Sequence, residues 1–393
     1  MKWLFQLSIL VLAVFTCKTS ANETQSQSHD ANAEDTAVIQ VDSWFEDFLE
    51  KLGADGEFDP TKPIDFSYLP GPFYNPEYEL GLGLSAVGLY QVGEPGESNP
   101  MSSLVINGLV STTGAFGVSV TNNTHYDNDN QRFYARLELF NIPEVYYGVG
   151  YELNRDDDNK VDYDSRQFRI TPMWQKRILP NSFAGIGLDY SYVDTRNIDI
   201  NESDIDVEDL SESSRNMGIN AMINYDTRDS TLRAENGVLA QIDLGVYRKS
   251  FGSKTNFEVL DMLYSQYMPI MQDDVLAWQV RGRFTHGDVP WDRLSRIGGD
   301  DLIRGYTSGR YRDEQMLLAQ VEYRQNLTGR HGMVYWAGAG VLSDEVNELL
   351  NSDILPTVGL GYRFEVKPKV NLRLDLAFGD GETGFYFNVN EAF

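Results

Sequence analysis

Residues 216–226 read Asn216-Met217-Gly218-Ile219-Asn220-Ala221-Met222-Ile223-Asn224-Tyr225-Asp226, and apolar and polar side chains alternate along them. Successive side chains of a strand point to opposite faces, so this segment has one apolar and one polar face. Similar alternation recurs from about Tyr78 to Phe393, with no helical segments that could cover the apolar faces. A membrane barrel satisfies this pattern, because lipid covers the outside, water fills the inside and closure leaves no unpaired edge.

The sequence therefore predicts an all-β fold, a transmembrane antiparallel β-barrel of outer-membrane type with about 16 strands. The long connections should lie together at the outer end, at 93–101, 126–131, 155–164, 194–215, 287–314 and 343–354. The expected strands are 78–91, 102–112, 115–125, 132–142, 145–154, 165–177, 182–193, 216–226, 237–248, 255–268, 275–286, 315–327, 332–342, 355–366, 370–378 and 383–393.

The first residues have the pattern of a signal peptide. Lys2 precedes the apolar run Trp3–Phe15, and Thr19-Ser20-Ala21 fits a cleavage site, so we assign 1–21 to the signal. A lipidated Cys17 is the alternative, which the preceding Phe15 and Thr16 disfavour. Residues 22–72 are acidic and predict a periplasmic tether, partly disordered, with a short amphipathic helix at 43–52. The barrel is expected to span 73–393.

Composition argues against several classes of function. The formal net charge of −27 disfavours binding to nucleic acid through a basic surface. Cleavage after Ala21 would remove the single cysteine, and with it thiol and thiolate–metal chemistry. The four histidines form no pattern with serine or with each other, so we predict no catalytic residues, no cofactor and no metal site. Acidic residues in 194–215 could bind calcium, but a solvated loop is the more common reading of such a segment.

The connection 287–314 combines loop residues with anchors typical of a folded structure. It contains a Gly298-Gly299 pair and the run Ile303-Arg304-Gly305-Tyr306. Glycines permit sharp turns, and an arginine inside a lumen of low dielectric pairs well with a carboxylate. The following strand presents Glu322 to the lumen, so we expect Arg304 to pair with Glu322 inside the barrel.

These residues resemble the bacterial surface antigen/BamA–TamA superfamily of 16-stranded outer-membrane barrels. In that family an Arg-Gly-aromatic motif lies at the tip of the sixth outer loop, which folds into the lumen. The resemblance assigns that role to Gly298, Gly299, Arg304, Gly305, Tyr306 and Glu322. Tyr225-Asp226-Thr227-Arg228-Asp229 is similar to the family's turn after the eighth strand, and Phe393 is similar to its C-terminal aromatic assembly signal. The alternation along the last strand, independently of the family, places Phe393 on the lipid face.

Two features depart from the family pattern. Members that insert or translocate proteins carry periplasmic polypeptide-binding (POTRA) modules, and this sequence has only the acidic tether before its barrel. The thirteenth strand often carries an acidic residue where this chain has Gly338, so Arg304 should depend more on Glu322. We expect both departures to leave the barrel fold unchanged. They bear on whether this chain shares the family's activity in inserting or translocating proteins.

The resemblance implies a role in outer-membrane assembly or in transport of protein or lipid. A porin-like channel is the first alternative, a barrel hydrolase the second and a structural or adhesive barrel the third. Expected partners are outer-membrane lipid, lipopolysaccharide and an envelope protein, in a Gram-negative bacterium. A lateral seam should separate the last strand from the first, where Gly81, Gly83 and Gly88 would weaken pairing.

Overall fold

The computed structural model describes residues 50–75, 78–93, 99–200, 203, 205–300 and 302–393. The predicted signal peptide and most of the predicted tether and of the helix at 43–52 lie outside these residues. The chain divides into a unit of 1–39 and a unit of 40–393, and everything described below belongs to the second.

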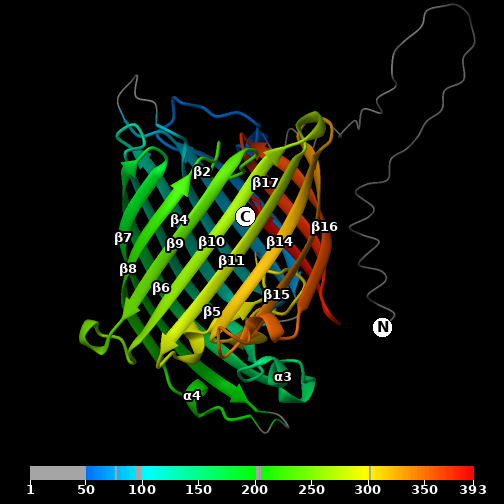
Figure 1. Ribbon diagram of the computed structural model, residues 1–393. Helices are drawn as coiled ribbons and strands as arrows, with labels where there is room; N and C mark the ends of the chain where they lie inside the picture. The colour runs from blue at the N-terminus through cyan, green and yellow to red at the C-terminus, as the bar shows by residue number, and fades with distance from the viewer. Residues whose placement is uncertain (1–49, 76–77, 94–98, 201–202, 204, 301) are drawn as a thin grey trace, which may run out of the picture. The chain divides into compact units, whose positions relative to one another are not determined.

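Sixteen antiparallel strands form one sheet that curves into a barrel, as predicted (Figure 1). Each strand pairs with its neighbours in sequence, except that β11 pairs with β14 across a loop that holds the two-stranded sheet of β12 and β13. The strands are β1 (Asp65–Asn75), β2 (Glu79–Tyr90), β3 (Ser102–Ser111), β4 (Phe116–Tyr126), β5 (Gln131–Tyr146), β6 (Val161–Leu179), β7 (Ser182–Asp199), β8 (Ser214–Asp226), β9 (Gly237–Tyr247), β10 (Phe257–Pro269), β11 (Val275–Gly287), β12 (Ser295–Ile297), β13 (Tyr311–Asp313), β14 (Gln315–Asn326), β15 (His331–Ser343), β16 (Leu355–Lys367), β17 (Val370–Phe378) and β18 (Thr383–Val389).

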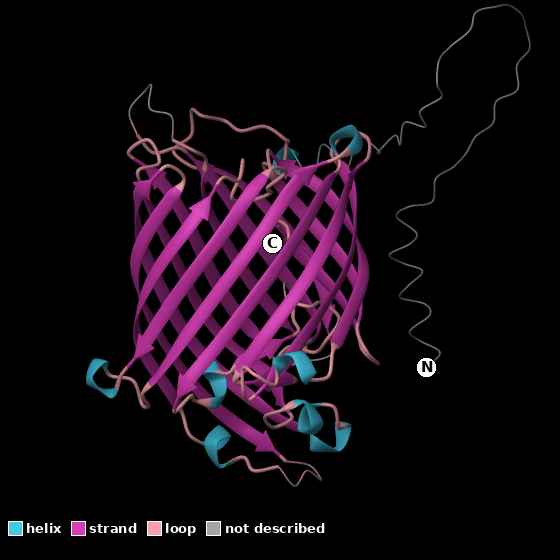
Figure 2. Cartoon of the chain, in the orientation of Figure 1, coloured by secondary structure: helices cyan, strands magenta, loops and turns pink. Residues whose placement is uncertain are grey.

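Between β1 and β18, the described residues form helical structure only in short turns of the connections (Figure 2). These are α3 (Tyr151–Asn154), η2 (Asp157–Asn159), α4 (Glu208–Ser211), η3 (Lys249–Phe251), η4 (Met271–Asp273), η5 (Trp291–Arg293) and η6 (Leu349–Asn351). Within the described part of the chain, no helix is both long and apolar enough to cross a bilayer.

The barrel wall is apolar outside and polar inside. On β8, Ile219, Ile223 and Tyr225 are 39%, 61% and 45% exposed. On the opposite face Asn216 and Asn224 are 0% and 5% exposed, because the lumen encloses them. A water-soluble sheet would bury the apolar face instead, so the exposures assign that face to lipid.

Because the strands are antiparallel, their connections alternate between two ends of the barrel. The loop end carries 147–160, 200–213, 288–314 and 344–354, and the turn end carries the short turns 180–181 and 368–369. Counted along the chain, 288–314 is the sixth connection at the loop end, as predicted, and is called loop 6 below.

The first part of the predicted strand order was wrong. The sheet begins with β1, which starts within the segment 22–72 assigned to the tether and ends beyond it, and 145–154 is not a separate strand. β5 instead continues to Tyr146, and the next residues turn at Gly148 and Gly150, whose φ angles are +84° and +97°. The two errors cancel after β5. Connections 93–101 and 126–131 therefore lie at the turn end, opposite the other four predicted outer loops.

Candidate functional site

Loop 6 folds back into the barrel, and its tip is buried. β12 and β13 pair at the base of the tip, where Ile297 lies opposite Tyr311. The backbone at Gly298, Gly299 and Gly305 has φ angles of +110°, +95° and +114°, which glycine adopts without steric cost. A Cβ atom at Gly305 would meet the main chain at Phe378 and Gly379, so the motif's glycine lets the loop press against the end of β17.

Arg304 is surrounded by partners in the lumen. Its side chain is 0% exposed, its Nη2 lies 2.5 Å from Oε1 of Glu322, and its Nη1 lies 2.5 Å from Oδ2 of Asp375. The guanidinium also lies over the Trp336 ring, 3.7 Å from the centroid. A buried guanidinium needs such partners because loss of hydration disfavours its charge.

The sequence predicted the contact with Glu322 but missed the second carboxylate. With Gly338 in place of an acid on β15, Arg304 was expected to depend on Glu322. Asp375 on β17 supplies the missing charge, and Trp336 on β15 covers the guanidinium face. Alternation along β17 placed Asp375 in the lumen, but no sequence signal paired it with loop 6.

Tyr306 anchors loop 6 to two neighbouring strands. Its hydroxyl donates to the carbonyl of Pro356 at 2.6 Å and accepts from the main-chain N–H of Asp380 at 3.0 Å. Burial raises the pKa of Tyr306 to about 12, so the hydroxyl keeps its proton and remains a donor. The aromatic residue of the motif therefore holds the loop in place through hydrogen bonds as well as packing.

Two chains of charged groups connect Arg304 with the last residues of the chain. Glu322 pairs with Arg324 at 2.9 Å, and Arg324 donates to the main-chain oxygen of Phe393 at 2.7 Å. In the second chain, Asp375 pairs with Arg363 at 2.6 Å, and Arg363 pairs with Glu391 at 2.7 Å. The loop tip and residues 390–393 thus belong to one buried polar network.

Phe393 therefore does not lie where the sequence placed it. β18 ends at Val389, Asn390 has a φ of +70°, and the following residues enter the barrel (Figure 1). The Phe393 ring packs against Tyr267 on β10, with ring centroids 6.4 Å apart, and joins a cluster with Val275 on β11. A position on the lipid face of the last strand is excluded for this aromatic ring in the folded barrel.

The sheet ends at β1 on one side and at β18 on the other. Within the described residues no strand ladder joins the two, although the Phe387 ring lies against Gly71 of β1. β18 has 7 residues and β17 has 9, whereas β6 and β7 have 19 and 18. The barrel wall is therefore shortest and least connected at this position, which we call the seam.

The glycines predicted to weaken the seam lie beside it rather than in it. Gly81, Gly83 and Gly88 are on β2, which pairs with β1 on one side and with β3 on the other. Gly81 makes room for the Phe73 ring of β1, because a Cβ there would overlap it. These glycines lie one strand away from the seam because the sequence analysis overlooked β1. The two prolines of β1 are residues that usually end a strand.

Loop 6 holds β18 from inside the barrel. The main-chain N–H of Gly305 donates to the Tyr386 hydroxyl at 3.1 Å, and the N–H and hydroxyl of Thr307 donate to Glu382 at 2.7 Å and 2.6 Å. Asn388 donates to the carboxylate of Asp300. The edge strand at the seam is therefore positioned by the loop as well as by its ladder with β17.

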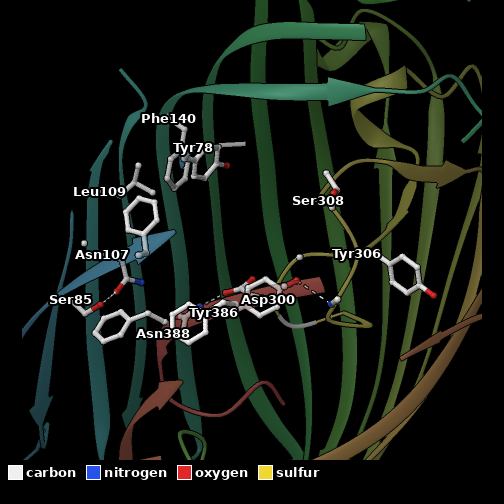
Figure 3. A pocket seen from close by; sticks show the side chains of 18 of the residues that line it. Tyr78, Ser85, Asn107, Leu109, Phe140, Asp300, Tyr306, Ser308, Tyr386 and Asn388 are labelled. Atoms are coloured by element: carbon white, nitrogen blue, oxygen red, sulfur yellow. Dashed lines mark hydrogen bonds between the residues drawn. The ribbon is translucent and has the colours of Figure 1, made fainter. Parts of the chain in front are cut away.

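A pocket of about 350 Å³ lies between loop 6, β18, β2 and β3 (Figure 3). Its apolar lining comes from Phe73, Leu84, Leu109, Phe140, Phe385 and Phe387. Its polar lining includes Ser85, Asn107, Asp300, Glu382 and Asn388. The pocket thus combines seam residues with the loop that carries Arg304.

The geometry gives little support to a hydrolase. His125 is buried and its Nδ1 lies 2.7 Å from Asp129, but the nearby Ser102 hydroxyl accepts from the main-chain N–H of His125 instead of meeting the ring. Its Nε2 has no hydrogen-bond partner among the described residues. In the same part of the chain, no group of three His, Cys, Asp or Glu side chains is placed to hold a metal ion.

The comparisons with known proteins agree with this architecture. A family model described as the Omp85 superfamily domain matches residues 103–393. No curated protein matches the sequence significantly. The resemblance to the BamA–TamA superfamily is thereby confirmed at the level of the superfamily.

Several solved barrels share the fold at low sequence identity. BamA from Haemophilus ducreyi, lacking POTRA domains 1–3, aligns with a TM-score of 0.51 and 13% identity, covering 83% of this chain and 69% of that chain. CdiB from Escherichia coli aligns with a TM-score of 0.57 and 10% identity, covering 85% and 62%. CdiB from Acinetobacter baumannii gives 0.51 and 12%, covering 83% and 59%. With a family match over 103–393 and sixteen strands in the expected order, the chain belongs to the Omp85 superfamily of outer-membrane barrels.

Proposed function

We propose that this barrel assists outer-membrane assembly, or the transport of protein or lipid, by giving access to the bilayer through the seam between β1 and β18. The observation that carries the proposal is the missing ladder between these strands among the described residues. Every backbone polar group inside a membrane needs a partner, so an unpaired junction is the place where a barrel wall opens at least cost. Loop 6 is in position to control that opening because it contacts β18.

A porin-like channel is less well supported. Arginines that a channel of this kind would have in its lumen are bound to carboxylates, since Arg281 and Arg283 both pair with Asp261 and Arg363 pairs with Asp375. Loop 6 and residues 390–393 also occupy the lumen. Paired charges and an occupied lumen both work against steady ion flow.

The proposal includes a partner. We expect the purified barrel alone not to accelerate the insertion of other barrels into liposomes, because the described residues contain no module that could collect an unfolded client. An envelope protein could supply such a module, and a barrel that acts on lipid would not need one. Both belong to the partner classes expected from the sequence.

A crosslink across the seam tests the proposal. Gly71→Cys and Phe387→Cys place two thiols at the seam, and the second change removes the ring that would collide with a new side chain at Gly71. Ala221→Cys with Leu244→Cys, a facing pair in the β8–β9 ladder, is the matched control. Each variant is reconstituted in vesicles and joined by a short thiol crosslinker.

Two activities are then followed: the folding of a small barrel client with envelope extract, and the transbilayer movement of a fluorescent phospholipid. We expect at least one of them to depend on the protein and to fall several-fold when the seam is crosslinked. The control crosslink should leave it unchanged. Equal activity with open and crosslinked seams would refute bilayer access through this junction.

A further inference from the structure

The seam edge of β1 lacks hydrogen-bond donors. The N–H of Tyr68 donates to the carbonyl of Leu52 at 2.8 Å, so even-numbered residues of β1 direct their N–H groups away from β2 and toward the seam. The next two positions on this edge are Pro70 and Pro72, and proline has no N–H. From Tyr68 to Pro72 the edge therefore has no donor available for another strand.

The segment before β1 keeps this edge covered at the turn end. Lys367, at the end of β16, is 0% exposed and donates to Asp55 at 2.6 Å and to Asp65 at 2.8 Å. Arg330 donates to the carbonyl of Ala54 at 2.6 Å. Residues 52–57 thus bind β1 and the end of β16, which lie on opposite sides of the seam.

An extended polypeptide is a poor fit for such an edge. Proline and covered edges are devices by which sheets prevent the addition of a further strand. A strand placed along Tyr68–Pro72 would leave its own carbonyl groups without donors in a water-poor environment. What enters the seam on the β1 side should therefore have no backbone to pair.

The seam pocket has the lining expected for an amphipathic chain. Figure 3 shows Leu109, Phe140 and Tyr78 at one end and Ser85 and Asn107 toward the other. Ser85 donates to Oδ1 of Asn107 at 2.7 Å, and the Nδ2 of Asn107 has no hydrogen-bond partner among the described residues. An apolar chain fits the first end, and an ester or phosphate oxygen could accept from the second.

The wall beside the pocket carries a second hollow on its exposed apolar face. This hollow shares five lining residues with the pocket: Gly83, Leu84, Gly108, Leu109 and Phe140. The second hollow is also lined by Leu82, Val110 and Val118, which are 57%, 56% and 43% exposed on the apolar face. Glycines at 83 and 108 leave this part of the wall without side chains, so the exposed apolar face and the pocket are separated by little more than backbone there.

We propose that the seam pocket binds the acyl chain of a membrane phospholipid, with the polar head toward Ser85 and Asn107. The inference rests on the proposed function and names lipid, instead of an extended polypeptide strand, as what the seam admits. The donor-free edge disfavours strand pairing on the β1 side, and the apolar lining of the pocket can pack against an acyl chain. Lipid on the outer surface of β2–β4 provides the source.

Photo-crosslinking tests the assignment in the intact barrel. A benzophenone amino acid replaces Leu109 in the pocket or, as a control, Gln279, which is buried on the lumen side of β11. The protein is placed in nanodiscs of phosphatidylethanolamine and phosphatidylglycerol, irradiated and analysed by mass spectrometry. We expect a phospholipid adduct at Leu109 at least fivefold above that at Gln279. Equal adducts, or a polypeptide adduct formed at Leu109 in cells, would overturn the proposal.

A second variant fills the pocket without disturbing the ladder. A Cβ at Gly83 would have ordinary contacts, at 3.6 Å from the Gly71 carbonyl and 3.8 Å from Phe73, so the site accepts a side chain. Gly83→Leu should reduce the adduct several-fold, whereas Gly83→Ala should retain it. An unchanged adduct in a folded Gly83→Leu barrel would count against the pocket as the binding site.

The two proposals fail in different ways. If the seam crosslink abolishes activity but no lipid adduct forms, the access route stands and the lipid assignment is wrong. If the lipid adduct forms but crosslinking the seam changes no activity, the pocket binds lipid and the proposed function is wrong.

Discussion

Among single residues, Arg304 contacts more strands of the barrel than the loop motif alone predicted. Its guanidinium joins Glu322 on β14 with Asp375 on β17 and lies over Trp336 on β15. Its carbonyl accepts from the hydroxyl of Thr357 on β16. One loop residue therefore contacts four successive strands beside the seam. This explains how a motif of a few residues can hold loop 6 inside the barrel.

Removal of Arg304 or Glu322 should destabilise the barrel. Breaking a buried ion pair typically costs about 3–5 kcal/mol because a charge is left without a partner. We expect Arg304→Ala to lower the unfolding temperature in heat-modifiability gels more than Glu322→Ala does, because Arg304 still pairs with Asp375 in the Glu322→Ala variant. Arg304→Lys should be intermediate, because one ammonium group cannot hold two carboxylates as a planar guanidinium does.

The double variant shows whether the two side chains act together. Groups that share an interaction have non-additive effects, so Arg304→Ala with Glu322→Ala should cost less than the two single changes combined. Strict additivity would mean that the pair does not exist in the membrane-embedded barrel.

Asp313 in β13 is a buried carboxyl group. Burial raises the pKa of Asp313 to about 6 from an ordinary value of 3.8, the Glu314 N–H opposes this, and the Asp344 carboxylate adds to it. A raised pKa means that the folded state holds the proton more tightly, so stability falls as pH rises from about 4 to about 6 and stays low above that.

Asp313→Asn should therefore raise the unfolding temperature of the barrel at pH 7.5 and leave it nearly unchanged at pH 4. Heat-modifiability gels at the two pH values measure this directly. A variant that is equally stable to the native barrel at pH 7.5 would show that the Asp313 carboxylate carries no penalty.

Contacts of single residues could be predicted from the sequence where they depend on a local motif. Gly305 and Tyr306 could be assigned to an inward loop because they stand together in a motif at a known position in the strand order. The partnership of Arg304 with Asp375 could not, since the two are far apart in sequence and several lumen carboxylates satisfy the same alternation. Phe393 was misplaced for the same reason: its contact with Tyr267 crosses the lumen.

At the scale of elements, β1 and β18 determine the character of the seam. β18 is short and is held by Tyr386 and Glu382 against loop 6. β1 has two prolines on the edge that faces the seam. Prolines are tolerated at the free edge of an edge strand because that edge needs no donors, whereas a proline facing a neighbouring strand removes one hydrogen bond from the ladder.

The prolines of β1 can be tested by restoring the donors. Pro70→Val with Pro72→Val returns two N–H groups to the seam edge, each able to contribute about 0.5–1.5 kcal/mol if β18 accepts it. We expect a higher unfolding temperature and less lipid adduct at position 109. Pro143→Val on β5, away from the seam, controls for the general preference of valine for strands.

If the double variant behaves like the Pro143→Val control in both measurements, the missing donors do not set the state of the seam. If only the unfolding temperature rises, the edge is repaired without changing lipid access.

Element boundaries were predictable where alternation was long and undisturbed, as on β8 and β14. They failed at β1 and at 145–154, for opposite reasons. β1 was missed because prolines such as Pro70 and Pro72 argue against a central strand, and the sequence does not show that β1 lies at the edge of the sheet. Val145, Tyr147 and Val149 imitated a strand, but Gly148 and Gly150 turn the chain with positive φ angles.

At the scale of the whole barrel, the distribution of polarity follows from its solvent. Ile223 and Tyr225 face lipid while Asn224 and Asp226 face the lumen, and the same inversion recurs around the wall. The fold class was therefore available from the sequence. The activity was not, because it depends on which junction stays unpaired and on what the loops place beside it.

We infer that, among the described residues, the wall is continuous at every junction except the one between β1 and β18. Hydrogen–deuterium exchange of the barrel in nanodiscs, read by mass spectrometry on peptides that cover β17 and β18, measures whether this junction is open. Both edges of β17 are paired, whereas β18 pairs with β17 alone among the described residues. We expect slow exchange throughout 370–378 and fast exchange for about half of the amides in 383–389, because alternate N–H groups face the seam. Uniformly slow exchange in both strands would contradict an open seam.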